Sequence, residues 1–279
     1  MLALARLRAT AYDLAVLAGH ALVYPTGLTQ ERPPAVPPPD PAPGPSDAGQ
    51  GHRPVLLLHG FIDNRSVFVL LRRSLRQLGR QHVLALNYSP LTADVRTAAA
   101  LFGHHVEEIC ARTGQARVDV VGHSLGGLIA RYYVQRLGGD ARVHTLVTLG
   151  TPHAGTRAAP LLSAHPLVRQ MRPDSDVIAE LRSPAPGCRT RFVSFWSDAD
   201  QWMIPVETAR VDHPDLTARD VRLTGIGHLA LPVHRAVAAG VREALDAADE
   251  PPPSAVGRRH RLLGRLGAVP RQARLRPRT

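Results

Sequence analysis

Apolar residues along this chain form short continuous runs that alternate with longer stretches of helical periodicity. The short runs are typical of strands that are buried on both faces of a parallel sheet. In the longer stretches, apolar residues recur every three or four positions, as they do on one face of a helix. The predicted strands are residues 55–58, 82–88, 118–121, 143–149, 191–196 and 220–224, and the predicted helices are residues 67–78, 94–112, 128–134 and 233–248. This alternation predicts an α/β fold, with a mostly parallel sheet covered by helices on both faces.

The clearest chemical signal lies in the turn between residues 118–121 and the helix that follows. The turn has the Gly-x-Ser-x-Gly pattern of a nucleophile elbow, with Ser124 at its centre. Gly122 and Gly126 lack the Cβ atoms that would collide where strand and helix pack closely. We therefore expect Ser124 to have a strained backbone and an exposed hydroxyl above the carboxyl ends of the strands, at a helix N-terminus.

A serine hydroxyl needs a base and an orienting carboxylate to act as a nucleophile at neutral pH. In folds with this elbow, the chain order is serine, then acid, then histidine. Asp200 and His228 follow Ser124 in that order, and each comes just after a predicted strand. Because the carboxyl ends of parallel strands meet at one edge, the three side chains should converge there. Asp198 is the alternative acid, although it lies nearer to the end of its strand.

Two backbone N–H groups are predicted to hold the negative charge of a tetrahedral intermediate. One belongs to Leu125, which follows the nucleophile, and the other to Phe61, in the loop after the first strand of the sheet. Residues 155–187 form a long, partly apolar connection, which predicts either a small lid over the serine or a plain crossover helix. An apolar lid would favour an acyl chain as substrate. Nothing in these residues implies a metal or an organic cofactor.

Five segments of the chain together resemble the bacterial lipases and esterases of the α/β-hydrolase fold. The resemblance is strongest to the triacylglycerol lipase group, whose elbow reads Gly-His-Ser-x-Gly-Gly, and it extends over about residues 54–248. The segments are residues 55–61, 122–127, 150–155, 197–205 and 225–229. The resemblance implies an α/β-hydrolase fold that cleaves carboxylic esters, in particular lipid acyl esters, through an acyl-enzyme. It also favours Asp200 as the acid and His228 as the base.

Two other classes of function fit the same residues. An acyltransferase or a lipid deacylase would use the same three side chains with a different acceptor. A hydrolase-like domain without catalytic activity would instead act as a scaffold. A fluorophosphonate probe that reacts with the nucleophilic serine separates an enzyme from a scaffold.

The chain is predicted to have further segments on both sides of a catalytic domain at residues 55–250. Residues 1–31 contain an amphipathic helix, over residues 3–23, and residues 32–54 are a proline-rich linker. The helix is compatible with docking on the domain, with a membrane surface, or with an atypical export signal. Asp13 interrupts its apolar stretch and no clear cleavage site follows, which favours a cytoplasmic or peripheral membrane location over secretion.

The net charge of +11 comes mostly from the end of the chain. Residues 251–279 contain eight arginines and no acidic residue, so the rest of the chain carries only +3. We expect this tail to be disordered or to contact anionic lipids. Nucleic acid is a weaker candidate partner because no aromatic residues interleave with the arginines. Cys110 and Cys188 match no zinc or redox motif, and they could form a disulfide or remain as two packed thiols.

Overall fold

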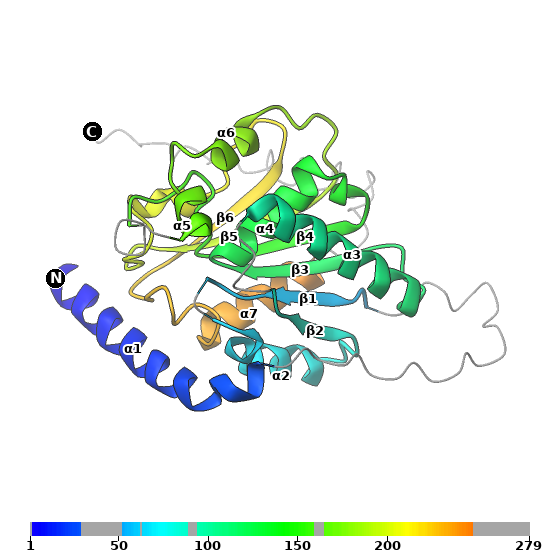
Figure 1. Cartoon of the computed structure of the whole chain (residues 1–279). Coiled ribbons are helices and arrows are strands. Elements are labelled where there is room, and N and C mark those ends of the chain that lie inside the picture. Colours follow the sequence, from blue (N-terminus) through cyan, green and yellow to red (C-terminus); the bar gives the residue numbers. More distant parts are fainter. Residues whose placement is uncertain (1, 29–51, 62, 89–93, 159–164, 248–279) are drawn as a thin grey trace, which may run out of the picture.

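The computed structural model of the protein describes residues 2–28, 52–61, 63–88, 94–158 and 165–247. Most of the predicted linker and the whole predicted tail lie outside the described residues. The described part contains an N-terminal helix and an α/β domain with the sheet at its centre (Figure 1).

Six parallel strands form the sheet, in the spatial order β2-β1-β3-β4-β5-β6. This order confirms the predicted parallel α/β fold. The edge strand β6 begins three residues earlier than predicted, because it pairs on one side only and is not continuously apolar. The strands are β1 (Val55–Leu58), β2 (Val83–Leu86), β3 (Val118–His123), β4 (Val143–Leu149), β5 (Arg191–Ser197) and β6 (Thr217–Leu223).

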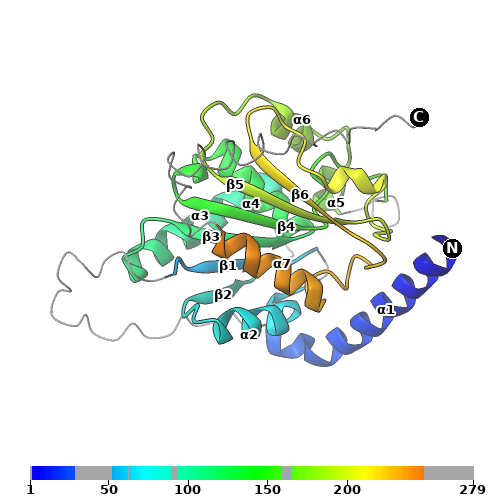
Figure 2. The same cartoon turned by 180° about the vertical axis from the view of Figure 1, so that it is seen from behind.

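Helices cover both faces of the sheet, as the sequence predicts (Figures 1 and 2). Helices α2 (Val69–Gln77) and α7 (Arg235–Asp246) pack on one face, and α3 (Val95–Thr113) and α4 (Leu125–Arg136) pack on the other. Side chains of β1 alternate between the two apolar layers, because successive residues of a strand point to opposite faces. Short 3-10 helices lie at η1 (Tyr24–Gly27), η2 (Arg65–Phe68), η3 (Gly139–Ala141) and η5 (Val206–Ala209).

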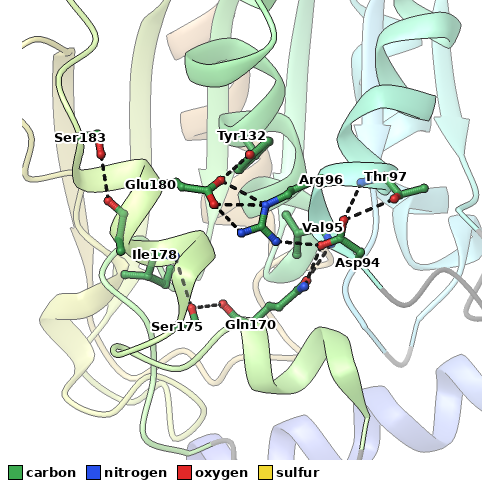
Figure 3. A network of polar contacts seen from close by, with 11 residues as sticks. Asp94, Val95, Arg96, Thr97, Tyr132, Gln170, Ser175, Ile178, Glu180 and Ser183 are labelled. Carbon is green, nitrogen blue, oxygen red and sulfur yellow. Dashed lines mark hydrogen bonds and ion pairs between the residues drawn. The ribbon is translucent and has the colours of Figure 1, made fainter.

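The described part of the connection at residues 155–187 is anchored to the domain. Its helices α5 (Pro166–Gln170) and α6 (Asp176–Arg182) contribute buried side chains to the same core as α3 and α4. Polar contacts add to this anchoring (Figure 3): Arg96 pairs with Glu180, and the side chain of Gln170 donates to Asp94 at 2.7 Å. Opening of this segment as a lid remains a prediction, and any such motion would have to break these contacts.

Helix α1 (Leu2–Val23) lies at the edge of the domain where the strands end (Figure 1). Among the described helices, none combines the length and apolarity that a membrane span needs. Cys110, in α3, is buried and Cys188 is half-buried, and both are free thiols, so they do not form the disulfide that the sequence left open.

Candidate active site

The turn between β3 and α4 has the strained geometry expected of a nucleophile elbow. Ser124 has φ 51° and ψ −120°, and among the described residues it is the single non-glycine residue with positive φ. Both flanking glycines are required by close backbone contacts. A Cβ on Gly122 would lie 2.4 Å from Gly127 Cα, and a Cβ on Gly126 would lie 2.4 Å from the Leu58 carbonyl oxygen. Strain of this kind persists only where the surrounding structure enforces it.

Ser124 is less accessible than the sequence predicts, because its relative exposure is only 9%. The residue lies in a largely apolar cavity of about 270 Å³, which the side chain of His228 also lines. Loops from distant parts of the chain form the walls of this cavity and shield the serine. Apolar wall residues include Phe61, Val168, Met171, Met203 and Leu229.

Asp200 and His228 form a buried hydrogen-bonded pair. Nδ1 of His228 lies 2.8 Å from Oδ2 of Asp200, so the ring donates to the carboxylate. The other oxygen, Oδ1, accepts from the backbone N–H groups of Trp202 and Met203 at 2.9 and 3.2 Å. Burial by itself lowers the pKa of His228, but the charge and hydrogen bond of Asp200 outweigh it, so that the pKa of His228 is raised.

Asp198, the alternative acid, lies elsewhere. Its Oδ1 accepts from the Gly225 backbone N–H at 2.9 Å, and its Oδ2 lies 3.3 Å from the Arg222 guanidinium. It therefore caps the turn after β6. Asp200, not Asp198, is the carboxylate that contacts His228.

The two residues predicted to supply N–H donors both lie close to the serine, since Leu125 follows it in the chain and Phe61 lines the same cavity. Leu125 is the first residue of α4, where backbone N–H groups lack helical partners. Phe61 lines the cavity, and the hydroxyl of Tyr88 holds the preceding loop by donating to the Gly60 carbonyl at 2.9 Å. The ring of His59 stacks on that of Tyr88 with centroids 4.4 Å apart, so it packs against the same loop. The role of Leu125 and Phe61 in binding an oxyanion remains a prediction.

A second aspartate–histidine pair, which was not predicted from the sequence, lies next to the first. Asp63 Oδ2 lies 3.2 Å from His123 Nδ1, and both side chains are buried. The other ring nitrogen of His123, Nε2, lies 3.2 Å from the main-chain oxygen of His228. Burial raises the pKa of Asp63, but its contacts with His123 and His20 outweigh this and hold the pKa well below its ordinary value. The sequence did offer a signal for this pair. Asp63 lies two residues after Phe61, and His123 directly precedes Ser124, so both are close in the chain to predicted site residues.

Trp202 was also missed. Its ring stacks on that of His228, with centroids 5.7 Å apart and an interplanar angle of 24°. The indole therefore covers one side of the imidazole, and Trp202 lines the cavity as well. Among the described residues, the site included, no group of three or more His, Cys, Asp or Glu side chains is arranged to hold a metal ion.

Comparison with known proteins identifies the family. Residues 54–202 match the family profile of the palmitoyl protein thioesterases, and this match covers more than half of the chain. The chain belongs to the palmitoyl protein thioesterase family. A segment of 55 residues is also 38% identical to a triacylglycerol lipase from Pseudarthrobacter phenanthrenivorans. That segment is 20% of this chain, and it spans only about a sixth (17%) of the length of the curated relative it matches.

Solved structures show the same fold. A Bacillus licheniformis lipase in its mature form superposes with a TM-score of 0.58 at 16% identity, over 78% of this chain and 96% of that one. Aspergillus fumigatus lipase B superposes with a TM-score of 0.63 at 18% identity, over 77% of this chain and 57% of that one. With the family match, this confirms the predicted relation to lipases and esterases of the α/β-hydrolase fold.

Proposed function

We propose that this protein is a serine hydrolase that cleaves acyl esters of lipids, with Ser124, His228 and Asp200 as its catalytic triad. One observation carries the proposal. The strained Ser124 and His228 line one largely apolar cavity, and His228 is hydrogen-bonded at 2.8 Å to the buried Asp200 behind it. A polar reactive group inside an apolar cavity suits a substrate with a carbonyl at the end of an acyl chain.

In the proposed mechanism, Ser124 Oγ attacks the carbonyl carbon while Nε2 of His228 takes the hydroxyl proton. Asp200 holds the ring in the tautomer that leaves Nε2 free to accept. The oxyanion is bound by the backbone N–H groups of Leu125 and Phe61. His228 then returns the proton to the leaving alcohol, and an acyl-enzyme remains. Water, deprotonated by His228, attacks this acyl group and releases the fatty acid and free Ser124.

A thioester is the second candidate substrate, because the chain belongs to the palmitoyl protein thioesterase family. The proposed chemistry is unchanged, except that a thiol leaves in place of an alcohol. An acyltransferase would differ only in the acceptor. Rates on matched oxygen and sulfur esters of one fatty acid, with and without added alcohol, would rank the three alternatives.

The test of the proposal is the Ser124→Ala variant. We expect it to lose hydrolysis of p-nitrophenyl esters and labelling by a fluorophosphonate probe, while its thermal unfolding temperature stays close to that of the wild type. Hydrolysis that survives the substitution would refute the proposal. Wild-type protein that neither labels nor hydrolyses any ester or thioester would favour a scaffold.

We further propose that α1 contacts lipid surfaces. Leu7, Leu14 and Leu22 of this helix have relative exposures of 66%, 61% and 84%. Apolar side chains on an exposed helix favour the boundary between lipid headgroups and acyl chains. Sedimentation with anionic vesicles tests this: replacing the three leucines by glutamine should reduce binding, and unchanged binding would contradict it.

A further inference from the structure

We propose that α1 is a positioning element of the active site, in which Asp13 and His20 hold the loop that carries the base His228. The inference rests on the proposed function, since it concerns the same catalytic histidine. It assigns to a helix more than 200 residues away in sequence a part in the geometry of catalysis.

The first contact is direct. Oδ1 of Asp13 accepts from the backbone N–H of Ala230 at 3.0 Å. On the other side of His228, Gly227 packs against the same carboxylate so closely that a Cβ there would lie 2.2 Å from Oδ2. Asp13 therefore contacts the chain both before and after the base. A loop with glycines at 225 and 227 has wide conformational freedom, so an external contact is needed to restrict it.

The second contact runs through three buried side chains. Nε2 of His20 is hydrogen-bonded to Ser66 Oγ at 2.9 Å, which turns Nδ1 toward Asp63 Oδ1 at 3.3 Å. Asp63 in turn pairs with His123, whose Nε2 lies 3.2 Å from the carbonyl oxygen of His228. Helix α1 thus reaches the main chain of His228 from a second direction.

A third contact involves the loop of the catalytic acid. The side chain of Gln201 donates to the hydroxyl of Thr10, so α1 also touches the residue next to Asp200. The helix therefore bridges the loops that carry the proposed acid and the proposed base. A shift of about 1 Å in a catalytic group can cost on the order of 100-fold in rate, which makes such bridging relevant to turnover.

Asp13 also adds a negative charge near the base. The charged and titratable groups that face His228 are Asp200, Asp63, His123 and Asp13, and each comes from a different segment. An additional carboxylate favours the imidazolium form of the base. Hydrogen bonding and charge can be separated, because asparagine keeps the oxygen that accepts from Ala230 but loses the charge.

The test compares Asp13→Ala with Asp13→Asn in the full chain, with p-nitrophenyl butyrate as substrate between pH 5 and 9. For Asp13→Ala we expect kcat to fall by about 10- to 100-fold at nearly constant KM. For Asp13→Asn we expect kcat within about threefold of the wild type at the pH plateau, with the acid limb of kcat/KM moved to lower pH. The matched control is Arg8→Ala, which removes a charge from an exposed site on the same helix.

His20→Ala is the second variant, and it should lower kcat by a smaller factor because it acts through Asp63 and His123. It keeps the proposal testable if Asp13→Ala does not fold. The proposal is wrong if folded Asp13→Ala and His20→Ala both match the Arg8→Ala control in kcat and in pH profile. A failure of the proposed function itself would look different, since Ser124→Ala would then retain activity.

Discussion

The Asp200→Asn substitution tests the assignment of the acid most sharply. In the wild type, Oδ1 of Asp200 accepts from the N–H groups of Trp202 and Met203, and Oδ2 accepts from His228 Nδ1. An asparagine would keep its oxygen toward the two N–H groups, because an amide nitrogen cannot accept from them. Its NH₂ group would then face Nδ1 of His228. That arrangement makes Nδ1 the acceptor and places the ring proton on Nε2, where it blocks transfer from Ser124.

The expected loss of kcat in Asp200→Asn follows from this change of the His228 tautomer. Both side chains are almost completely buried, with exposures of 4% for His228 and 1% for Asp200, so water cannot easily replace the lost acceptor. In triads of this kind, the same substitution lowers kcat by about 10⁴-fold with little change in geometry. At 1.36 kcal/mol for each factor of ten, this is about 5.4 kcal/mol of lost transition-state stabilisation.

The assay is the initial rate of p-nitrophenyl ester hydrolysis at pH 8, with thermal unfolding to confirm that the variant folds. Asp198→Asn is the matched control: it lies in the same loop but contacts Gly225 and Arg222 at the surface, so its rate should stay within about threefold of the wild type. If Asp200→Asn keeps a tenth or more of the wild-type kcat, or if Asp198→Asn is the variant that fails, the assignment of the acid is wrong.

Three more predictions follow from the site. First, kcat/KM should fall as the pH drops through the pKa of His228; because that pKa is raised, the loss should begin above the ordinary value of about 6.5, and an acid limb centred below 6 would contradict this. Second, Gly126→Ala should destabilise the fold by about 1–3 kcal/mol or more, because its Cβ would meet the Leu58 carbonyl oxygen; an unchanged unfolding temperature would argue against it. Third, Val168→Trp or Met171→Trp should fill the cavity and lower the rate on long-chain relative to butyrate esters by at least about tenfold; an unchanged ratio would place the acyl chain elsewhere.

Local patterns in the sequence were sufficient to predict the parallel sheet and the elbow at Ser124. Strand β4 was predicted to its exact bounds because it is rich in β-branched residues and is followed directly by Gly150, whereas β6, half-exposed at the edge, was predicted to start too late. Helix α3 was predicted to end at residue 112 and ends one residue later, at Thr113, where Gly114 follows with φ 67°. These features depend on residues close to one another in the chain, so periodicity and turn chemistry reveal them.

The site was only partly visible in the sequence. Ser124, Asp200 and His228 could be named because each follows a strand, and the structure brings Asp200 and His228 into contact at 2.8 Å. The burial of Ser124 was not expected, since the shielding loops come from several separate segments. Asp63 and His123 resemble ordinary loop and strand-end residues until the fold places them side by side.

The amino-acid sequence alone was enough to predict the α/β-hydrolase fold and the elbow, because a strand followed by a sharp turn and a helix is encoded within a few consecutive residues. It was also enough to propose Ser124, His228 and Asp200 as nucleophile, base and acid. Only the tertiary structure decided that α1 lies across the loops of the site and that Asp13 contacts the chain beside His228. A contact between residues 217 positions apart depends on how the whole chain packs. Helical periodicity in the sequence predicts which face of α1 is apolar, but it does not predict which residues of the domain either face will contact.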